Sequence, residues 1–328
     1  MEVHLVTADG AEQHPAGEIP DLLKRDDGVV WVDIPRCDEE ALAVLTDVFD
    51  CHPLAVEDCF RRNRVPRVHV YPQHVFVILH SPQLGAGGHV HYVELDQFVG
   101  ERYLITVHGP VNAAVPPDVP QRETRSVLAR IQAGRYRPRT PHELAYAIVS
   151  ASTRQQERVV EQLTGDVWRL EQRVTSGDRG GDPEAFLEEL FRARHALMAV
   201  RTIAVTAYDI YGRLASLGRF LPDADRHLVD DLIDQFDRVR SLADGERDYL
   251  QGVIDFYRAR TETKMTIAAE RLTVIAVVTL PITAIGSIYG MNMIVNEQTH
   301  FGQLIAVLAV MAAISTVLLT WAKRQGWW

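Results

Sequence analysis

The C-terminal part of the chain contains two long apolar stretches without a charged residue. They cover residues 272–289 and 301–321, which are 18 and 21 residues long. About 20 apolar residues cross the hydrocarbon core of a bilayer as a helix, so both stretches predict transmembrane helices. A buried helical hairpin in a soluble core is the alternative, but interior helices are usually shorter and amphipathic. The neutral tetrapeptide Tyr289-Gly290-Met291-Asn292 stands where a membrane hairpin would turn.

The first 110 or so residues alternate between short apolar runs and turn-forming residues. Helical spacing interrupts these runs at residues 39–49 and 53–60, the second with Pro53 at its start. The glycine-rich residues 85–88 lie between two expected strands, so we interpret them as a hairpin loop and not as a phosphate-binding loop, which needs a following helix. This order predicts an α/β sandwich around a central sheet, with strands at residues 29–34, 68–71, 75–79, 92–99 and 103–107.

Long helical patterns follow from Thr140 onward. Thr140-Pro141-His142-Glu143 combines an N-cap, a proline at the first helical position and a capping-box glutamate. A second helix is expected from Asp182-Pro183 to about Leu217. A third begins near Arg226 and meets no strong stop before Gly290, although Pro281 should kink it. The third helix would join the soluble part to the first membrane span.

Charge sets the expected orientation in the membrane. Basic residues stand before the first span and after the second, and none lies between them. By the positive-inside rule both termini are expected in the cytoplasm and the 290–300 loop outside, where Glu297 is its one formal charge. The N-terminus has no signal-peptide pattern, and three cysteines do not suggest a disulfide framework. The net charge of −10 argues against nucleic acid as a partner and is compatible with cations.

Polar and small residues follow one face of the third helix near the membrane. At about 100° per residue, eight positions fall within about 120° of arc. Such a stripe suits the wall of a water-lined pore, because polar groups in hydrocarbon must be satisfied by protein or water; close helix packing is the alternative use of small residues. The eight are Thr266, Ala269, Leu272, Thr273, Ala276, Leu280, Thr283 and Ser287.

Two spans cannot enclose an aqueous path, so a pore requires a homo-oligomer with the first span inside. Asn292 would then form a ring of amide oxygens at the outer mouth, and Gly290 would let the backbone approach the axis. A neutral amide ring suits a cation that keeps its water, and Mg²⁺ dehydrates reluctantly. A divalent ion that crosses 100 mV gains about 4.6 kcal/mol, which is enough to drive inward flow.

Several motifs together resemble the CorA family of divalent-cation channels. They are Thr279-Leu280-Pro281-Ile282-Thr283, Tyr289-Gly290-Met291-Asn292, the His52–Asp58 segment followed by Arg64-Val65-Pro66-Arg67-Val68, and the Glu94–Gly100 segment followed by Tyr103–His108. The resemblance covers essentially the whole chain. It implies a funnel-shaped homopentamer with an α/β cytoplasmic domain (residues 1–139), a long-helix stalk (140–271), a pore-lining span (272–289), an external filter loop (290–300), a second span (301–321) and a cytoplasmic tail (322–328).

The resemblance also implies roles for individual residues. Gly290, Met291 and Asn292 take the filter position, and intracellular Mg²⁺ is expected to close the channel by binding between subunits. Asp231 aligns best with the family's regulatory carboxylate, with Asp230, Asp234 and Asp237 close by. Such aspartates are also typical of a solvated helix face. This chain departs from many relatives by Thr266 in place of Asn, by Ala269 in place of Met, and by the lack of a Pro-Glu pair after the triplet.

Two other functions stay open at this point. A proton-coupled Zn²⁺ transporter of the same superfamily could draw on the scattered histidines and cysteines, although no pair has zinc-finger spacing. Those residues are Cys51, His52, Cys59, His69, His74, His80, His89, His91 and His108. A membrane-anchored metal sensor is the second alternative. An enzyme is not expected, because no phosphate loop, nucleophile elbow or hydrolase signature is present.

Overall fold

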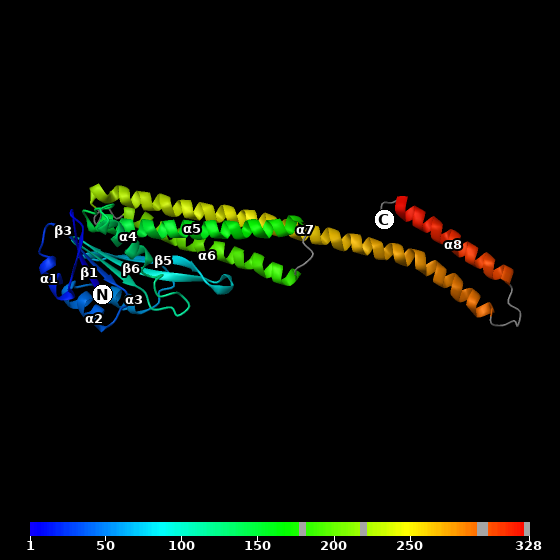
Figure 1. The fold of residues 1–328 in the computed structure, drawn as a ribbon, viewed down its shortest axis with the longest axis horizontal. Coiled ribbons are helices and arrows are strands. Elements are labelled where there is room, and N and C mark those ends of the chain that lie inside the picture. The colour runs from blue at the N-terminus through cyan, green and yellow to red at the C-terminus, as the bar shows by residue number, and fades with distance from the viewer. Residues whose placement is uncertain (177–181, 217–221, 294–300, 325–328) are drawn as a thin grey trace. The chain divides into compact units, whose positions relative to one another are not determined.

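A computed structural model describes residues 1–176, 182–216, 222–293 and 301–324. The chain divides into two compact units, Met1–Gly252 and Val253–Trp328. The first unit contains a sheet covered by helices on both faces, and the second contains the end of one long helix and a further apolar helix (Figure 1).

A seven-stranded mixed sheet forms the centre of the first unit. Its strand order is β2-β1-β3-β7-β6-β5-β4. Strands β3 and β7 pair in parallel, and the other neighbouring pairs are antiparallel. The strands are β1 (Glu2–Thr7), β2 (Ala11–His14), β3 (Gly28–Ile34), β4 (Arg67–Val70), β5 (His74–Leu84), β6 (Val90–Gly100) and β7 (Tyr103–His108).

The longest strands, β5 and β6, form a hairpin that pairs from His74↔Gly100 to Leu84↔Val90. The loop between them contains Gly87 and Gly88, whose φ angles of 68° and 77° suit glycine. This confirms the prediction that the glycine-rich run is a hairpin loop.

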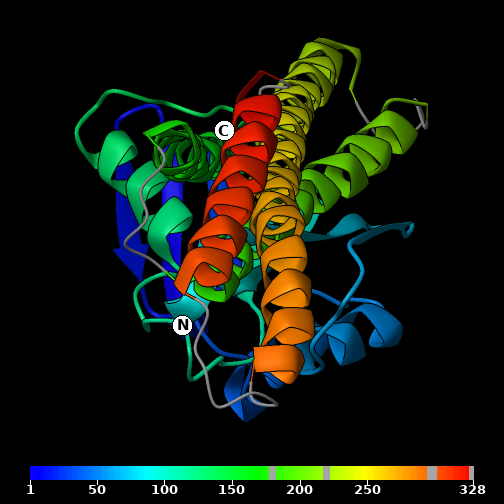
Figure 2. The ribbon, with the colours of Figure 1, turned by 90° about the vertical axis from the view of Figure 1, so that its right-hand side faces the viewer.

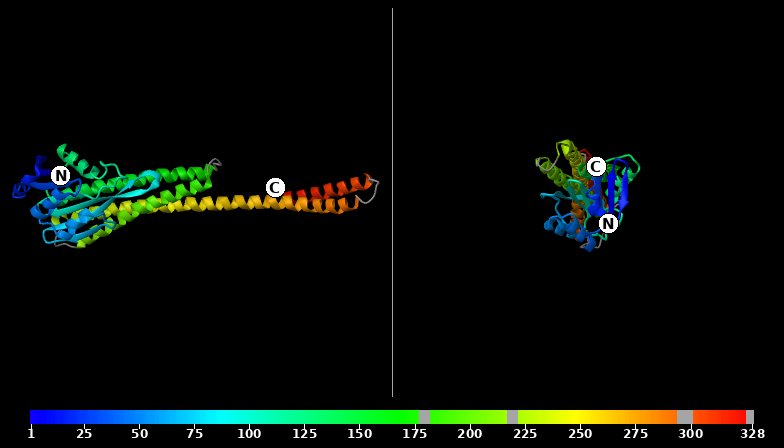
Figure 3. Two further views of the ribbon diagram at one scale, coloured as in Figure 1. Left: turned by 90° about the horizontal axis from the view of Figure 1, so that it is seen from below. Right: turned by 90° about the vertical axis from the view of Figure 1, so that its left-hand side faces the viewer.

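Both faces of the sheet are buried by helices, which gives three layers. Alternate residues of β3 show this: Val30 and Val32 pack in one core with the short helices, whereas Val29 and Trp31 pack in another with the longer helices. Figure 1 shows the long helices running along one side of the sheet, and Figure 3 gives two further views of the chain. The first layer holds α1 (Ile19–Leu22), α2 (Glu39–Ala43), the π-helical turn η2 (Val44–Val48) and α3 (Pro53–Phe60); the other holds α4 (Arg122–Gln132), α5 (Pro141–Ser176), α6 (Pro183–Ser216) and the start of α7 (Arg226–Met293).

The expected helix starts are made by the expected caps. The Glu143 N–H donates to Thr140 Oγ1 at 3.1 Å, and Glu143 Oε2 in turn accepts the Arg139 N–H at 2.6 Å. The Glu184 N–H donates to Asp182 Oδ1 at 3.0 Å. These bonds satisfy N–H groups that have no partner within the first helical turn.

Three features differ from the sequence-based expectation. Strands β1 and β2 and helices α1 and α4 were not predicted. The change from strands to long helices near residue 140 does not divide compact units, because α5 and α6 pack on the sheet. The loop expected to begin at Gly290 begins later, since α7 is helical to Met293; an unbroken helix keeps backbone groups paired in apolar surroundings.

The second unit consists of two helices that are long and apolar enough to cross a membrane. The C-terminal part of α7 lies beside α8 (Phe301–Arg324), which runs back along it in the opposite direction (Figures 1 and 2). The apolar windows of these helices are 6% and 0% buried within the chain. Most of their apolar surface therefore has no cover from the chain itself.

Candidate functional site

The eight stripe residues lie on α7, and all are exposed in the single chain. The two largest of them, Leu272 and Leu280, are 67% and 68% exposed. The stripe is therefore a free surface of this chain, available to water, lipid or another copy.

The opposite face of α7 is the one covered in the second unit. Val274 is buried and Val278 and Ile285 are half-buried, and at about 100° per residue they fall about 140–180° from the centre of the stripe. On α8 the half-buried and buried positions recur at helical spacing along one face, at Leu304, Val307, Met311, Ile314, Ser315, Leu318, Leu319 and Ala322. Helix α8 therefore covers α7 on the side away from the stripe.

The threonines of the stripe bond to their own helix. Oγ1 of Thr266, Thr273 and Thr283 donates to the carbonyl four residues earlier, at 3.0, 2.9 and 2.9 Å. The hydroxyl proton is thus satisfied within the helix, and the oxygen lone pairs remain as acceptors. An acceptor surface of this kind suits the water shell of a cation.

The Gly290-Met291-Asn292 triplet occupies the last turn of α7. A Cβ built at Gly290 would meet nothing within 4 Å, so glycine is not required there by packing within the chain. The tip of the following loop, with Glu297, lies outside the described residues.

Asp231 is held by two side chains of the first unit. Its Oδ2 accepts hydrogen bonds of 2.6 Å from the Tyr146 hydroxyl and from Gln235 Nε2. Burial, followed by the bond to Asp231, raises the pKa of Tyr146. The Asp231 carboxylate is itself exposed, and the hydrogen bonds from Tyr146 and Gln235 fix its orientation.

The neighbouring aspartates do not gather into a metal site within one chain. Asp230 and Asp234 are exposed, and Asp237 pairs with Arg240. Among the described residues, no group of three histidine, cysteine or acidic side chains is placed to hold a metal ion. Carboxylates on this face of α7 would need oxygen ligands from another chain or from water to complete a Mg²⁺ shell.

Three of the histidines considered for zinc have structural partners. His80 Nε2 lies 2.9 Å from the Asn63 carbonyl, and His108 Nε2 lies 2.9 Å from Asp33 Oδ1. His52 caps α3 by accepting the Leu54 N–H at 3.3 Å. Each of these bonds gives one ring nitrogen of these three histidines a structural role.

The residues that fix Asp231 were not found from the sequence. Tyr146 lies 85 residues before Asp231, and Thr153, which bonds to Gln235, lies on the same helix as Tyr146. No spacing rule links positions so far apart. The signal available was only the i, i+4 relation between Asp231 and Gln235.

The fold and the exposed helices define an integral membrane protein with two C-terminal transmembrane helices behind an α/β sandwich. The chain belongs to the CorA-like Mg²⁺ transporter protein family, whose model matches residues 26–324. Divalent-cation transport is therefore the class of function that membership of this family gives.

Individual relatives agree over most of the chain. It is 24% identical over 307 residues to the putative metal ion transporter YfjQ of Bacillus subtilis, covering 90% of this chain and 89% of that protein. It is 24% identical over 290 residues to the cobalt/magnesium transport protein CorA of Thermotoga maritima, covering 86% and 78%.

Solved structures share the fold. The complete CorA magnesium transporter of Methanocaldococcus jannaschii matches with a TM-score of 0.80 at 18% identity, over 100% of this chain and 99% of that one. The ZntB cytoplasmic domain of Vibrio parahaemolyticus matches with a TM-score of 0.61 at 11% identity, over 80% and 98%. Because both share the fold, the fold alone does not choose between cations.

Proposed function

We propose that this chain is the subunit of a channel that admits hydrated Mg²⁺ down the membrane potential, with Co²⁺ and Ni²⁺ as further cargo, and that intracellular Mg²⁺ closes it. The observation that carries the proposal is the stripe on α7: it is exposed, it offers hydroxyl oxygens, and it lies opposite the face covered by α8. One copy cannot enclose a path with a single such face. A homopentamer with α7 inside and α8 toward lipid would place five stripes around one axis.

The proposed division of the chain follows from this arrangement. Residues 1–139 form the sheet and its short helices, and residues 140–271 form the long-helix stalk, whose first two helices pack on that sheet; both parts lie in the cytoplasm. Residues 272–289 line the pore, and residues 290–300 hold the filter, on the last turn of α7, and the external loop. Residues 301–321 form the second span, and residues 322–328 return to the cytoplasm. The membrane is proposed to be the plasma membrane. Both termini are proposed to lie in the cytoplasm, since basic residues flank both inner ends of the spans.

Gly290, Met291 and Asn292 are proposed as the selectivity filter. In a regular helix Gly290 and Met291 fall at about 240° and 340°, within the arc of the stripe, whereas Asn292 falls at about 80°. A ring of Asn292 amides therefore requires the chain to leave helical geometry at the triplet in the assembled channel. Such a ring would hold the water shell of the ion and not the ion itself.

Closure is proposed to rest on Asp231, with Asp230 and Asp234 beside it. The carboxylate is exposed and fixed by Tyr146 and Gln235, so it is presented outward at low cost in side-chain entropy. Repulsion between carboxylates of adjacent subunits would favour opening. Mg²⁺ that binds between them would cancel the repulsion and stabilise the closed state.

Reconstitution into liposomes tests this function. Mg²⁺ influx should rise with a negative internal potential and fall as internal Mg²⁺ increases. Zn²⁺ flux that follows a proton gradient, with no Mg²⁺ flux, would favour the zinc transporter instead. Asn292→Ala should abolish flux while leaving the oligomer intact. Unchanged flux in this variant would exclude Asn292 from the filter. If the wild-type chain itself carries no flux, a membrane-anchored sensor would be favoured.

A further inference from the structure

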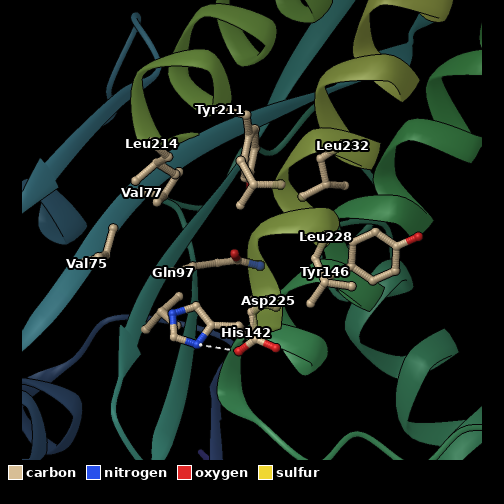
Figure 4. Close-up of a pocket in the computed structure, with 13 residues that line it drawn as sticks. Val75, Val77, Gln97, His142, Tyr146, Tyr211, Leu214, Asp225, Leu228 and Leu232 are labelled. Atoms are coloured by element: carbon tan, nitrogen blue, oxygen red, sulfur yellow. Dashed lines mark ion pairs between the residues drawn. The ribbon is translucent and has the colours of Figure 1, made fainter. Parts of the chain in front are cut away.

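A small apolar cavity lies in the first unit, between the sheet and the long helices. Its volume is about 60 Å³, room for roughly five water-sized groups. Valines of β5 and β6 form its floor, and side chains of α5, α6 and α7 close it (Figure 4). The most apolar part of the wall consists of Val75, Val77, Leu214, Leu228 and Leu232. None of the proposed pore or regulatory residues lines this cavity.

One polar group inside the cavity has no partner. Gln97 of β6 is 1% exposed, and among the described residues its Nε2 has no hydrogen-bond acceptor. Figure 4 shows its amide extending into the space between the apolar side chains. An unpaired buried donor is costly, so its presence in a cavity needs an explanation. A ligand atom that accepts a hydrogen bond from Nε2 would provide one.

The cavity is held open by contacts on its outer side. The Tyr146 hydroxyl is anchored by Asp231 at 2.6 Å, and Tyr211 stacks on Phe236 with ring centroids 5.7 Å apart. Because these rings are fixed from outside, the walls cannot collapse easily into the space. The site is preformed, which lowers the cost of binding.

The charges at one end of the cavity exclude an anion. The buried carboxylate of Asp225 lies there, 3.5 Å from His142 Nδ1. Burial lowers the pKa of His142, so the ring is neutral at neutral pH and does not offset the negative charge. A protonated amine is also a poor match, because it offers no acceptor to Gln97.

We propose that this cavity is a binding site for a small uncharged molecule that has an apolar ring or chain and one carbonyl oxygen. The apolar part fills the space between the valines and leucines, and the carbonyl oxygen accepts the Gln97 Nε2–H bond. The proposal does not depend on which cation the protein transports.

Cyclopentanone is a suitable probe, with cyclopentane as its matched partner without the carbonyl. The full chain in detergent, labelled at valine and leucine methyl groups, is titrated with each probe and followed by NMR. We expect saturable shifts confined to the cavity methyls, and about fivefold to tenfold weaker binding of cyclopentane. Shifts that do not saturate, shifts spread evenly over distant methyls, or tighter binding of cyclopentylamine than of cyclopentanone would contradict the proposal.

A variant without the Gln97 amide tests how much the hydrogen bond to the probe contributes to binding apart from the apolar contacts. Gln97→Leu should bind both probes equally, whereas Gln13→Leu, on the exposed strand β2, should keep the wild-type preference. A retained preference in Gln97→Leu would overturn the role of the amide. If Gln97→Leu fails to fold, the probe pair on the wild-type chain still decides the question, since equal affinity for the two probes contradicts the proposal.

Discussion

The two units of this chain bury apolar surface in opposite ways. In Met1–Gly252 the strands are covered on both faces, and side chains such as Phe76, Phe98 and Ile105 have no exposed area. In the second unit Leu272, Leu280 and Val317 are about two-thirds exposed. The first unit closes its core within one chain, whereas the second is completed by lipid and, as proposed, by other copies. The proposed function depends on the apolar and hydroxyl-bearing surface of the second unit, which the chain itself leaves uncovered.

The largest expected effect contrasts two apolar truncations. Phe98→Ala removes a fully buried ring that lies 4.5 Å from Phe76 between centroids, and it should lower the free energy of unfolding by about 3–5 kcal/mol. Leu280→Ala should change it by less than about 0.5 kcal/mol, because that side chain is exposed in the chain. Urea unfolding of the full chain in detergent, followed by near-UV circular dichroism, measures both. Equal losses would contradict the contrast.

A bulky substitution on α7 and one on α8 test which helix lines the pore and which faces lipid. Ala276→Trp places a ring in the stripe and should reduce Mg²⁺ flux at least tenfold, because the proposed path is narrowed by every subunit at once. Val317→Trp, on an exposed position of α8, should leave flux within about twofold, since tryptophan is tolerated where a helix meets lipid. Flux into liposomes with matched protein content provides the measurement. A stronger loss from Val317→Trp would reverse the assignment of the two helices.

Removal of the fixed carboxylate tests the regulatory role of the first unit. Asp231→Ala should raise the internal Mg²⁺ concentration for half-closure by about fivefold or more, the usual size of coupling between sites. Asp248→Ala is the matched control, an exposed aspartate on the same helix that pairs with Arg247. If both variants close at the wild-type concentration, Asp231 has no part in gating.

The smallest effect concerns a carboxyl enclosed in the first unit. Burial, and then the nearby Glu94, raises the pKa of Asp96 well above its ordinary value. Its protonated form is the stable one, so the folded state loses stability as pH rises above about 3.8 and through the raised pKa. Asp96→Asn should remove that loss and be more stable than wild type at pH 8 by about 1 kcal/mol.

The matched control for this pH effect is Asp118→Asn, an exposed loop residue that should keep the wild-type dependence. Unfolding midpoints measured at several pH values between 4 and 8 provide the test. A wild-type pH profile in Asp96→Asn would show that the carboxyl is not protonated in the folded chain.

Sequence signals that span only a few residues predicted much of this fold, but they missed strand β1 and helix α4. Pro53 and the Thr140 cap marked helices that begin where expected, since capping is encoded within a few residues. Strand β1 was missed because it is buried on both faces: Leu5 and Val6 are both fully buried, so the alternation of polar and apolar residues stops after four residues. Helix α4 was missed because seven of its eleven residues are charged or polar, which leaves only four apolar residues to mark its buried face.

The candidate site likewise has features that local sequence patterns predict and features that they do not. The stripe on α7 could be predicted because it depends on the period of one helix. Its eight residues are exposed in the chain, and their role in a pore stays a prediction. The partners of Asp231 and the unpaired amide of Gln97 could not, because they depend on packing between distant elements. Helical geometry at the triplet was also missed, since the sequence around Gly290 resembles a turn.

The accessibility of single cysteines on α7 tests whether the stripe lines a water-filled path. In a chain with its three native cysteines replaced by alanine, single cysteines are placed at Thr273, Ala276 and Thr283, and at Val274 and Val278 as controls. A charged, membrane-impermeant thiol reagent is added to open channels in liposomes while Mg²⁺ flux is recorded. We expect block at the three stripe positions and none at the two positions that face α8. Block at Val274 and Val278 with unreactive stripe positions would contradict it.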